Sequence, residues 1–155
     1  MSDPKYYFQY CQKIIVFSED WMSVLLVRRR SEADFDETFS FIGGKMEVTD
    51  QSIIAGLQRE KNEEIGETAS VRVYTDSTHN VLFRKADGSS VILPHYLAQF
   101  RGGDIVLNLA EYSEFRWVHL EDLPSFEPKI ENISEMVTWA LGIKQSVKLA
   151  DFVEI

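Results

Sequence analysis

The sequence predicts an α+β fold built on a mixed β-sheet. Strand-like runs are joined by segments typical of hairpin turns, and two segments have helical periodicity. One helical segment falls between strand-like runs and the other near the end of the chain, so strands and helices do not alternate as they do in a parallel βαβ fold. A chain of 155 residues fits one hydrophobic core, and a single domain over residues 1–155 is expected.

Two hairpins are predicted from short polar segments between strand-like runs. Residues 18–21 separate the first two runs, and Asp87-Gly88 is a dipeptide that favours a tight turn between two later runs. Pro94 has no backbone N–H to donate, so an edge strand or a bulge is expected around it. The strand-like runs are residues 7–17, 22–29, 71–75, 81–86, 90–100 and 115–120.

Two helices are predicted, over residues 52–65 and about 130–142. Asp50 or Ser52 can cap the start of the first helix, and Gly66 stands where a helix commonly ends in a left-handed conformation. The apolar face expected of the first helix contains Ile54, Leu57 and Ile65, and that of the second contains Ile133, Met136, Val137 and Ala140.

The first helix also carries an acidic cluster. At 100° per residue, Glu60, Glu63 and Glu64 fall within an arc of roughly 100°, and Arg59 stands one turn before Glu63. At a separation of about 6 Å and an effective dielectric of about 20, each close pair of carboxylates costs roughly 2–3 kcal/mol. A divalent cation offsets this repulsion, and oxygen ligands favour Mg²⁺ or Mn²⁺ over zinc. The alternative is a solvated helix face.

A glycine pair before this helix favours the cation site over the solvated face. Gly43-Gly44 follows a short apolar run and permits close approach of the backbone to a ligand. Lys45 comes next and can meet a phosphate. The two features together suit a phosphate-containing ligand that binds beside the acidic cluster.

The segments 43–47, 59–60 and 63–66 together resemble the Nudix box of the Nudix (MutT-like) hydrolases. The box reads glycine, five residues, glutamate, seven residues and then R-E-U-x-E-E-x-G-U, where U is aliphatic. The resemblance covers a loop–helix–loop segment of about residues 43–67, and it is specific because many fixed positions fall in register. It implies the Nudix fold, in which a mixed β-sheet is sandwiched between helices (α/β/α).

The match departs from the pattern at the first acidic position and at two aliphatic positions. Counting forward from the box glycine places the first acidic residue at Asp50, whereas counting back from Arg59 places it at Gln51, so one extra residue is present. Lys61 and Glu67 stand at aliphatic positions, and Lys61 is expected to extend its charge to solvent or to mark an open helix face. These departures leave a Nudix-fold nucleotide-binding module without catalysis as the alternative to an enzyme.

The resemblance implies an enzyme that hydrolyses a pyrophosphate bond in a nucleoside diphosphate linked to another group, with Mg²⁺ or Mn²⁺ as cofactor. A nucleoside or deoxynucleoside triphosphate is the favoured substrate, while ADP-ribose, nucleotide sugars and dinucleoside polyphosphates stay open. Glu60 is implied as a metal ligand or as the base that activates water, and Arg59 as the residue that orients the carboxylates. Carried onto this chain, the implied catalytic residues are Arg59, Glu60 and Glu63 with Glu111 or Glu114 from a later loop, and the implied metal ligands are the carbonyl of Gly44 or Gly43 and the carboxylates of Glu60, Glu63 and Glu64.

Three arginines end the second strand-like run. Alternation along a strand places Arg29 on the opposite face from Arg28 and Arg30, and we predict that Arg28 and Arg30 bind substrate phosphates together with Lys45. An ordinary exposed strand end is the alternative. The aromatic residues that can stack on a base are Phe8, Tyr10, Phe83 and Trp117.

The composition limits the partners of the protein. Asp and Glu number 25 against 16 Lys and Arg, and the net charge of −9 repels nucleic acid and anionic membranes. A single cysteine, the lack of an apolar signal-peptide core and the lack of an apolar run of about 18 residues favour a cytoplasmic protein. The expected partner is a small nucleotide, and a homodimer is left open.

Overall fold

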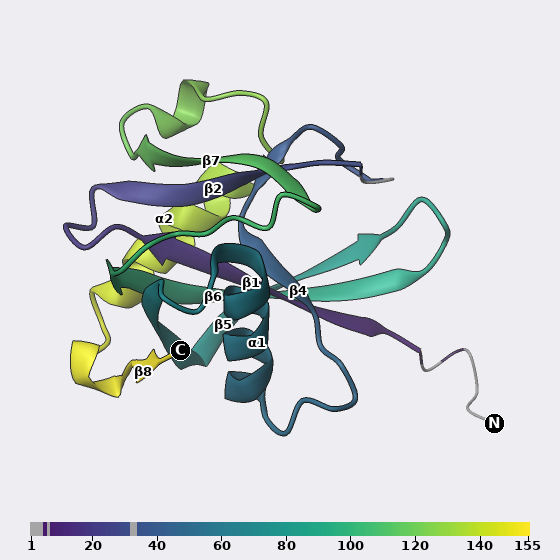
Figure 1. Cartoon of the computed structure of the whole chain (residues 1–155), viewed down its shortest axis with the longest axis horizontal. Helices are drawn as coiled ribbons and strands as arrows, with labels where there is room; N and C mark the ends of the chain where they lie inside the picture. The colour runs from purple at the N-terminus through teal and green to yellow at the C-terminus, as the bar shows by residue number, and fades with distance from the viewer. Residues whose placement is uncertain (1–4, 6, 32–33) are drawn as a thin grey trace.

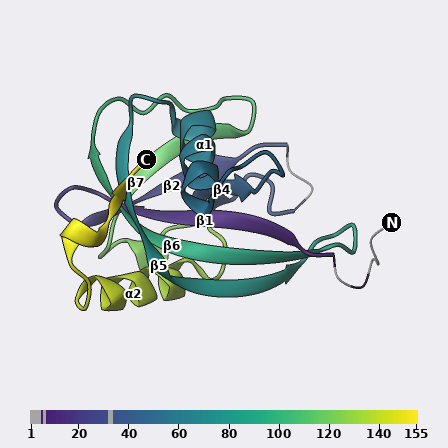
Figure 2. The same cartoon turned by 90° about the horizontal axis from the view of Figure 1, so that it is seen from below.

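In the computed structural model, which describes residues 5, 7–31 and 34–155, one mixed β-sheet lies between two helices (Figure 1). Helices α1 and α2 cover opposite faces of the sheet, as the view from below shows (Figure 2). The α+β class and the sandwich of sheet and helices are therefore confirmed. The elements are β1 (Gln9–Phe17), β2 (Ser23–Arg29), β3 (Phe39–Ser40), β4 (Ile42–Lys45), α1 (Ile53–Ile65), β5 (Ser70–Arg84), β6 (Ser90–Gly102), β7 (Tyr112–His119), α2 (Ile133–Lys144) and β8 (Val153–Glu154), with short 3₁₀ turns at Leu123–Ser125 and Leu149–Asp151.

Strand β1 is the centre of the sheet because it pairs with three other strands. The strand order is β3-β2-β1-β6-β5-β8, with β7 beside β2 and β4 beside β1. On one side β1 runs parallel to β6, and on the other it pairs with β2 next to the turn, at Phe17↔Val24, and with β4 along its first half. The hairpin predicted between β1 and β2 is thus confirmed at its turn, but β4 takes the place of β2 farther along β1.

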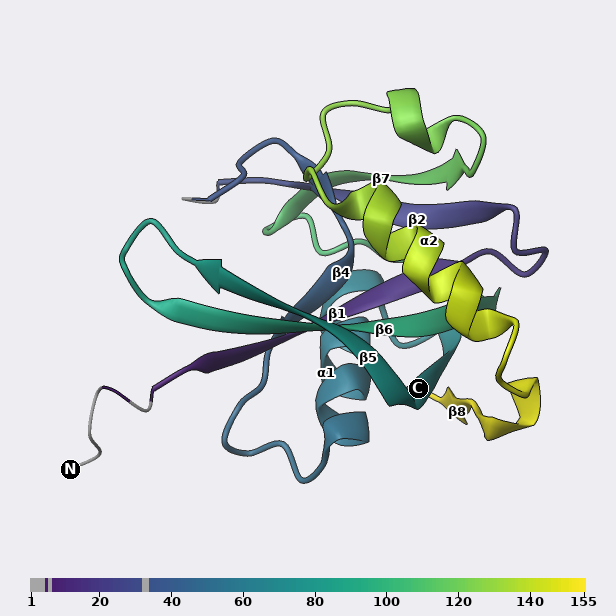
Figure 3. The same cartoon turned by 180° about the vertical axis from the view of Figure 1, so that it is seen from behind.

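The β5–β6 hairpin extends beyond the body of the sheet, as the view from behind shows (Figure 3). Strand β5 contains the run predicted at 71–75 and residues 81–84 of the run predicted at 81–86, joined through an irregular stretch of the ladder with β6. The turn predicted at Asp87-Gly88 is confirmed, and Gly88 has a φ of 87°. A positive φ of this kind suits glycine because it has no Cβ.

Pro94 lies inside the sheet, so the expectation of an edge strand is wrong. Its strand β6 pairs with β5 on one side and with β1 on the other. The parallel ladder with β1 is interrupted between Tyr10↔Ile92 and Lys13↔His95. A gap in the ladder accommodates a residue that has no N–H to donate.

Helix α1 begins and ends where the sequence predicts. Ser52 is the N-cap, and its hydroxyl accepts a hydrogen bond from the backbone N–H of Ala55 at 3.0 Å. Gly66 ends the helix with a φ of 91°. The limits of the helix are therefore set by local capping chemistry. No helix among the described residues is long and apolar enough to cross a membrane.

The alternating faces of β1 divide the core into two clusters, one under each helix. Because both faces of this strand are covered, its apolar run is continuous and does not alternate with polar residues. The cluster on the α1 side includes Ile14, Val16, Leu57 and Ile65, and the cluster on the α2 side includes Ile15, Phe17 and the four predicted residues of α2, Ile133, Met136, Val137 and Ala140.

Lys61 does not reach solvent, so the expectation of an extended lysine or an open helix face is wrong. Its side chain is 2% exposed, and its ammonium group donates hydrogen bonds to the carbonyls of Ala69 at 2.8 Å and Gly66 at 3.4 Å. Burial lowers the pKa of Lys61. The lysine thus joins the last turns of α1 to the loop that follows it, and two carbonyls take the place of solvent.

We expect Leu57→Ala to lower the free energy of unfolding by about 2–5 kcal/mol, since it opens a cavity in the α1 cluster. The matched control is Ile54→Ala on the same helix. Ile54 was predicted to share the buried face, but it is 36% exposed, so its truncation should cost less than about 1 kcal/mol. Urea denaturation of both variants measures the difference, and equal losses would contradict this assignment of the core.

Candidate active site

A cavity of about 1100 Å³ is lined by residues of α1, the glycine strand β4, strands β1, β5 and β6 and the start of α2. Its size suits a nucleotide-sized ligand. Most of the residues predicted from the sequence line this cavity, although they come from three separate segments of the chain. They are Gly43, Gly44, Lys45, Arg59, Glu60, Glu63, Glu64 and Glu111.

Arg59 and Asp50 form a two-point ion pair at the edge of this cavity. The Nε and Nη2 atoms of Arg59 donate to the two carboxylate oxygens of Asp50, at 2.8 and 2.9 Å. Hydrogen bonding to Arg59 lowers the pKa of Asp50 to about 2. Gln51, the alternative position for the first acidic residue, is exposed. The extra residue therefore lies after Asp50, in the turn before α1.

Arg59 also binds the acidic cluster and the glycine strand. Its Nη1 atom donates to Glu60 at 3.0 Å and to Glu63 at 3.2 Å. Its Nη2 atom donates to the backbone carbonyl of Lys45 at 3.0 Å. One guanidinium group thus fixes the end of β4 against α1, as the fork of N–H donors on arginine permits.

Glu60 is buried against Gly44. The side chain of Glu60 is 6% exposed, and a Cβ on Gly44 would lie 2.3 Å from its Oε2 atom. Burial raises the pKa of Glu60, and the nearby charges of Glu63 and Glu111 add to this effect while Arg59 opposes it. A glycine is therefore required here so that the backbone can contact the carboxylate.

Glu64 is 3% exposed and receives a hydrogen bond from the backbone N–H of Gly43 at 2.7 Å. Burial raises the pKa of Glu64 to about 8, although the charge of Lys13 and hydrogen bonds from Gly43 and Tyr112 oppose the shift. Gly43 has a φ of 136°, and a Cβ there would lie 1.9 Å from the carbonyl oxygen of Gln12. Gly43 is thus enclosed between β1 and the carboxylate.

The donors in this cavity fit a magnesium or manganese ion. They are oxygen atoms, which both ions prefer, and the raised pKa values of the buried Glu60 and Glu64 mean that the site favours a cation or a proton. Among the described residues, no three acidic, histidine or cysteine side chains converge as a ready-made metal site. Arg59 supplies the positive charge between Glu60 and Glu63 instead.

The structure separates Glu111 from Glu114. Glu111 lines the cavity, and its backbone carbonyl accepts a hydrogen bond from the N–H of Arg30 at 2.8 Å. Glu114 does not line the cavity. Its carboxylate lies 3.5 Å from Arg28 and 3.3 Å from Arg116. Of the two later-loop candidates, Glu111 is therefore the one placed to act in the cavity.

The arginines of β2 have the opposite arrangement from the one expected. Arg29 lines the cavity, whereas Arg28 and Arg30, which were predicted to bind substrate, do not. Arg28 donates to the carbonyl of Glu37, and Arg30 donates to the carbonyl of Leu109. The predicted alternation is right, but it does not reveal which face of β2 meets the cavity.

The loop before Glu111 also closes the end of helix α1. The N–H groups of Val106 and Asn108 donate to the carbonyls of Ile65 and Glu64, both at 2.9 Å. These are carbonyls that a helix end leaves without an intrahelical partner. The loop and the last turn of the helix are thus one hydrogen-bonded unit.

Aromatic and aliphatic side chains also line the cavity, and of these the sequence indicated Phe83 alone. Phe35 and Phe83 both line it, with ring centroids 5.4 Å apart. The remaining apolar lining residues that the sequence analysis missed are Phe41, Val81, Val91, Leu93, Ile130 and Ile133. They come from three elements and the connections between elements, so no local pattern marks them as a group.

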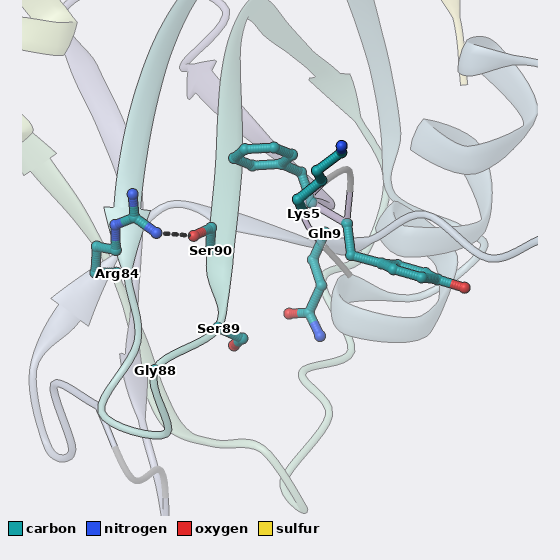
Figure 4. Close-up of a pocket in the computed structure, with 8 residues that line it drawn as sticks. Lys5, Gln9, Arg84, Gly88, Ser89 and Ser90 are labelled. Atoms are coloured by element: carbon teal, nitrogen blue, oxygen red, sulfur yellow. Dashed lines mark hydrogen bonds between the residues drawn. The ribbon is translucent and has the colours of Figure 1, made fainter. Parts of the chain in front are cut away.

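A second cavity, of about 490 Å³, lies at the tip of the β5–β6 hairpin (Figure 4). Arg84 donates a hydrogen bond to the hydroxyl of Ser90 across its mouth. Lys5 and Gln9 approach it from the start of the chain. Of the residues predicted from the sequence only Phe8, a stacking candidate, lines this cavity, and none of the predicted catalytic, metal or phosphate-binding residues does. The candidate active site is therefore the larger cavity beside α1.

The NUDIX domain model matches residues 11–140, which is most of the chain. The chain therefore belongs to the Nudix family, and the resemblance found in the sequence is confirmed.

Solved structures of Nudix proteins have the same fold at low sequence identity. The MutT protein of Methanosarcina mazei superposes with a TM-score of 0.68 and 21% identity over 91% of this chain and 96% of that one. The NUDIX domain of Shewanella oneidensis NrtR, solved with ADP ribose, has a TM-score of 0.67 and 20% identity over 95% of this chain and 94% of that domain. A C. elegans Ap4A hydrolase has a TM-score of 0.70 and 15% identity over 90% of this chain and 99% of that one. No curated protein matches the chain significantly in sequence.

We expect the Arg59–Asp50 pair to stabilise the fold in a pH-dependent way. The pKa of Asp50 is about 2 in the folded protein against 3.8 for a free side chain, so the folded state binds fewer protons than the unfolded state. The stabilisation is complete well above pH 3.8 and is lost as the pH falls toward 2. Urea denaturation of the wild type and Asp50→Asn between pH 3 and 7 should show a stability difference that shrinks in acid, and a pH-independent difference would contradict this.

Proposed function

We propose that the protein is a metal-dependent enzyme that hydrolyses a pyrophosphate bond in a nucleoside diphosphate linked to another group. The observation that carries the proposal is the pair of buried carboxylates, Glu60 and Glu64, held by Arg59 and Gly43 at the edge of a nucleotide-sized cavity. Buried acids with raised pKa values are typical of functional sites rather than of a solvated helix face.

The residues that would hold Mg²⁺ or Mn²⁺ are Glu60, Glu63 and Glu64 with the backbone carbonyl of Gly44. When bound, the ion supplies positive charge to the phosphate oxygens and lowers the pKa of water. Arg59 orients Glu60 and Glu63 through the hydrogen bonds described above. A carboxylate oxygen of Glu60 or Glu111 is placed to accept the proton of the attacking water, because both side chains face the cavity.

Arg29 and Lys45 are the proposed phosphate-binding residues, since both line the cavity. In this proposal Arg29 takes the role expected of Arg28 and Arg30, which do not line the cavity. The aromatic wall of Phe35 and Phe83 offers a stacking surface for a base.

The favoured substrate is a nucleoside or deoxynucleoside triphosphate, supported by the similarity of the fold to a MutT protein over nearly its full length. ADP-ribose, nucleotide sugars and dinucleoside polyphosphates are the competing substrates, because the fold is equally similar to an ADP-ribose-bound domain and to an Ap4A hydrolase. A cytoplasmic location, where such nucleotides occur, is part of the proposal.

A panel of these nucleotides, assayed for phosphate or pyrophosphate release with and without Mg²⁺ or Mn²⁺, tests the function. We expect turnover that requires the metal, and a fall in kcat/KM of about 100-fold in Glu63→Gln because a metal ligand is lost. The matched control is Glu67→Gln, which removes an exposed carboxylate from the loop after α1 and should leave the rate unchanged. Tight nucleotide binding without turnover would support the binding module instead.

The positions of Glu111 and Glu114 predict which of them contributes to turnover. Glu111→Gln should lower kcat by about 10-fold or more, because Glu111 lines the cavity and its charge acts on Glu60. Glu114→Gln should have a much smaller effect, because its carboxylate pairs with Arg28 and Arg116 outside the cavity lining. Steady-state kinetics of the two variants with the best substrate of the panel provides the measurement, and a larger loss in Glu114→Gln would contradict the assignment.

A further inference from the structure

We propose that Lys13 is a phosphate-binding residue, whose ammonium group donates to a phosphoryl oxygen of the nucleotide independently of the metal ion. This inference rests on the proposed function for the identity of the ligand. The sequence gives no sign of it, because Lys13 lies within the apolar run of β1 and outside the Nudix box.

No hydrogen bond or ion pair from the residues that the structure describes reaches the ammonium group of Lys13, a residue that lines the cavity and is 9% exposed. Its charge acts on Glu64 from beyond ion-pair distance. Lys61, the other buried lysine, instead donates to two backbone carbonyls. The ammonium group of Lys13 therefore has its three donors available for an anion in the cavity.

The strand register places Lys13 beside the acidic cluster. Lys13 is the Cα partner of Gly43 on β4, and the N–H of Gly43 donates to the Glu64 carboxylate. The positive charge of Lys13 acts on Glu64, although the two do not form an ion pair among the described contacts. A diphosphate bound at these carboxylates would therefore lie next to the ammonium group.

His95, the neighbour of Lys13 on the other side, is not an alternative counter-charge. It is the Cα partner of Lys13 on β6, and its Nδ1 atom lies 3.0 Å from the carbonyl of Leu93 and 3.2 Å from that of His79. Both neighbours of Nδ1 are acceptors, so this nitrogen carries the proton and donates. The imidazole is neutral near pH 7, because burial lowers its pKa to about 4.

The position of Lys13 favours a phosphate over a base as its ligand. The base-stacking wall includes Phe83, the Cα partner of Val91, which is four residues along β6 from His95. Four residues of a strand span roughly 13 Å, so the aromatic wall lies well away from Lys13. A lysine has three donors and no acceptor, and it recognises phosphate as a point charge.

Arg59, the cation that is hydrogen-bonded to the acidic cluster, is already occupied. Arg59 donates to Asp50, Glu60 and Glu63, and it has little remaining capacity for a substrate oxygen. The protein carries a net charge of −9, which repels a polyphosphate. An unpaired cation at the wall of the cavity offsets this repulsion where the substrate enters the acidic cluster.

The test measures binding of an α,β-methylene nucleoside triphosphate, which has the phosphate charges but resists cleavage at that bond, in EDTA and in Mg²⁺. Lys13→Met should weaken binding about 10- to 100-fold in both conditions, as expected when a hydrogen bond to a charged group is lost. Lys13→Arg, which keeps the charge, should restore most of the affinity. The matched control is Lys61→Met, which removes the other buried lysine and should bind the analogue as the wild type does.

Two further measurements distinguish a phosphate contact from a base contact and from damage to the metal site. The affinity for the free nucleoside should be the same in Lys13→Met and the wild type. If Lys13→Met weakens nucleoside binding as much as it weakens binding of the triphosphate analogue, Lys13 contacts the base and the proposal is overturned. Mn²⁺ affinity, followed by electron paramagnetic resonance, should be unchanged or higher in Lys13→Met, and a parallel loss would indicate damage to the metal site. If Lys13→Met does not fold, Lys13→Gln replaces it, and thermal unfolding of each variant verifies the fold.

The outcomes for Lys13 and for the enzyme are distinguishable. Metal-dependent turnover with unchanged analogue binding in Lys13→Met would overturn the role of Lys13 and keep the enzyme. If Lys13→Met weakens analogue binding but the wild type shows no turnover, the phosphate contact stands and the proposed enzyme activity is overturned. A wild type that binds no analogue in either condition would overturn both.

Discussion

The site depends on the guanidinium group of Arg59. It binds Asp50 in the turn before α1, the carbonyl of Lys45 at the end of β4 and two carboxylates on its own helix. These groups belong to separate segments, and one planar fork of donors holds them in a fixed arrangement. The repulsion among the glutamates is offset at the same point, so the geometry and the electrostatics of the site have a common origin.

The limits of helix α1 and its acidic cluster could be predicted because the signals are local. One short segment of the chain contains the serine cap, the terminal glycine and the three glutamates Glu60, Glu63 and Glu64 with their angular spacing. The glycine pair was recognisable for the same reason. Its close contacts with Glu60 and with β1 explain why glycine occurs there, and they come from the tertiary structure.

The features that could not be predicted from the sequence depend on which face of a strand meets the cavity. Alternation separates Arg29 from Arg28 and Arg30 but does not say which side of β2 faces inward. The choice between Glu111 and Glu114 has the same origin, because β7 pairs with β2 and carries Glu114 opposite Arg28. The two buried lysines could not be recognised either, since the carbonyl partners of Lys61 lie in a loop and Lys13 has none among the described residues.

The segment 106–111 joins two parts of the acidic site mechanically. Its backbone N–H groups satisfy the last carbonyls of α1, including that of Glu64, and its final residue is Glu111. Backbone hydrogen bonds therefore attach the loop that carries Glu111 directly to the helix end that carries Glu64. A substitution that breaks these bonds would be expected to alter the relative position of the two acidic segments without changing either acid.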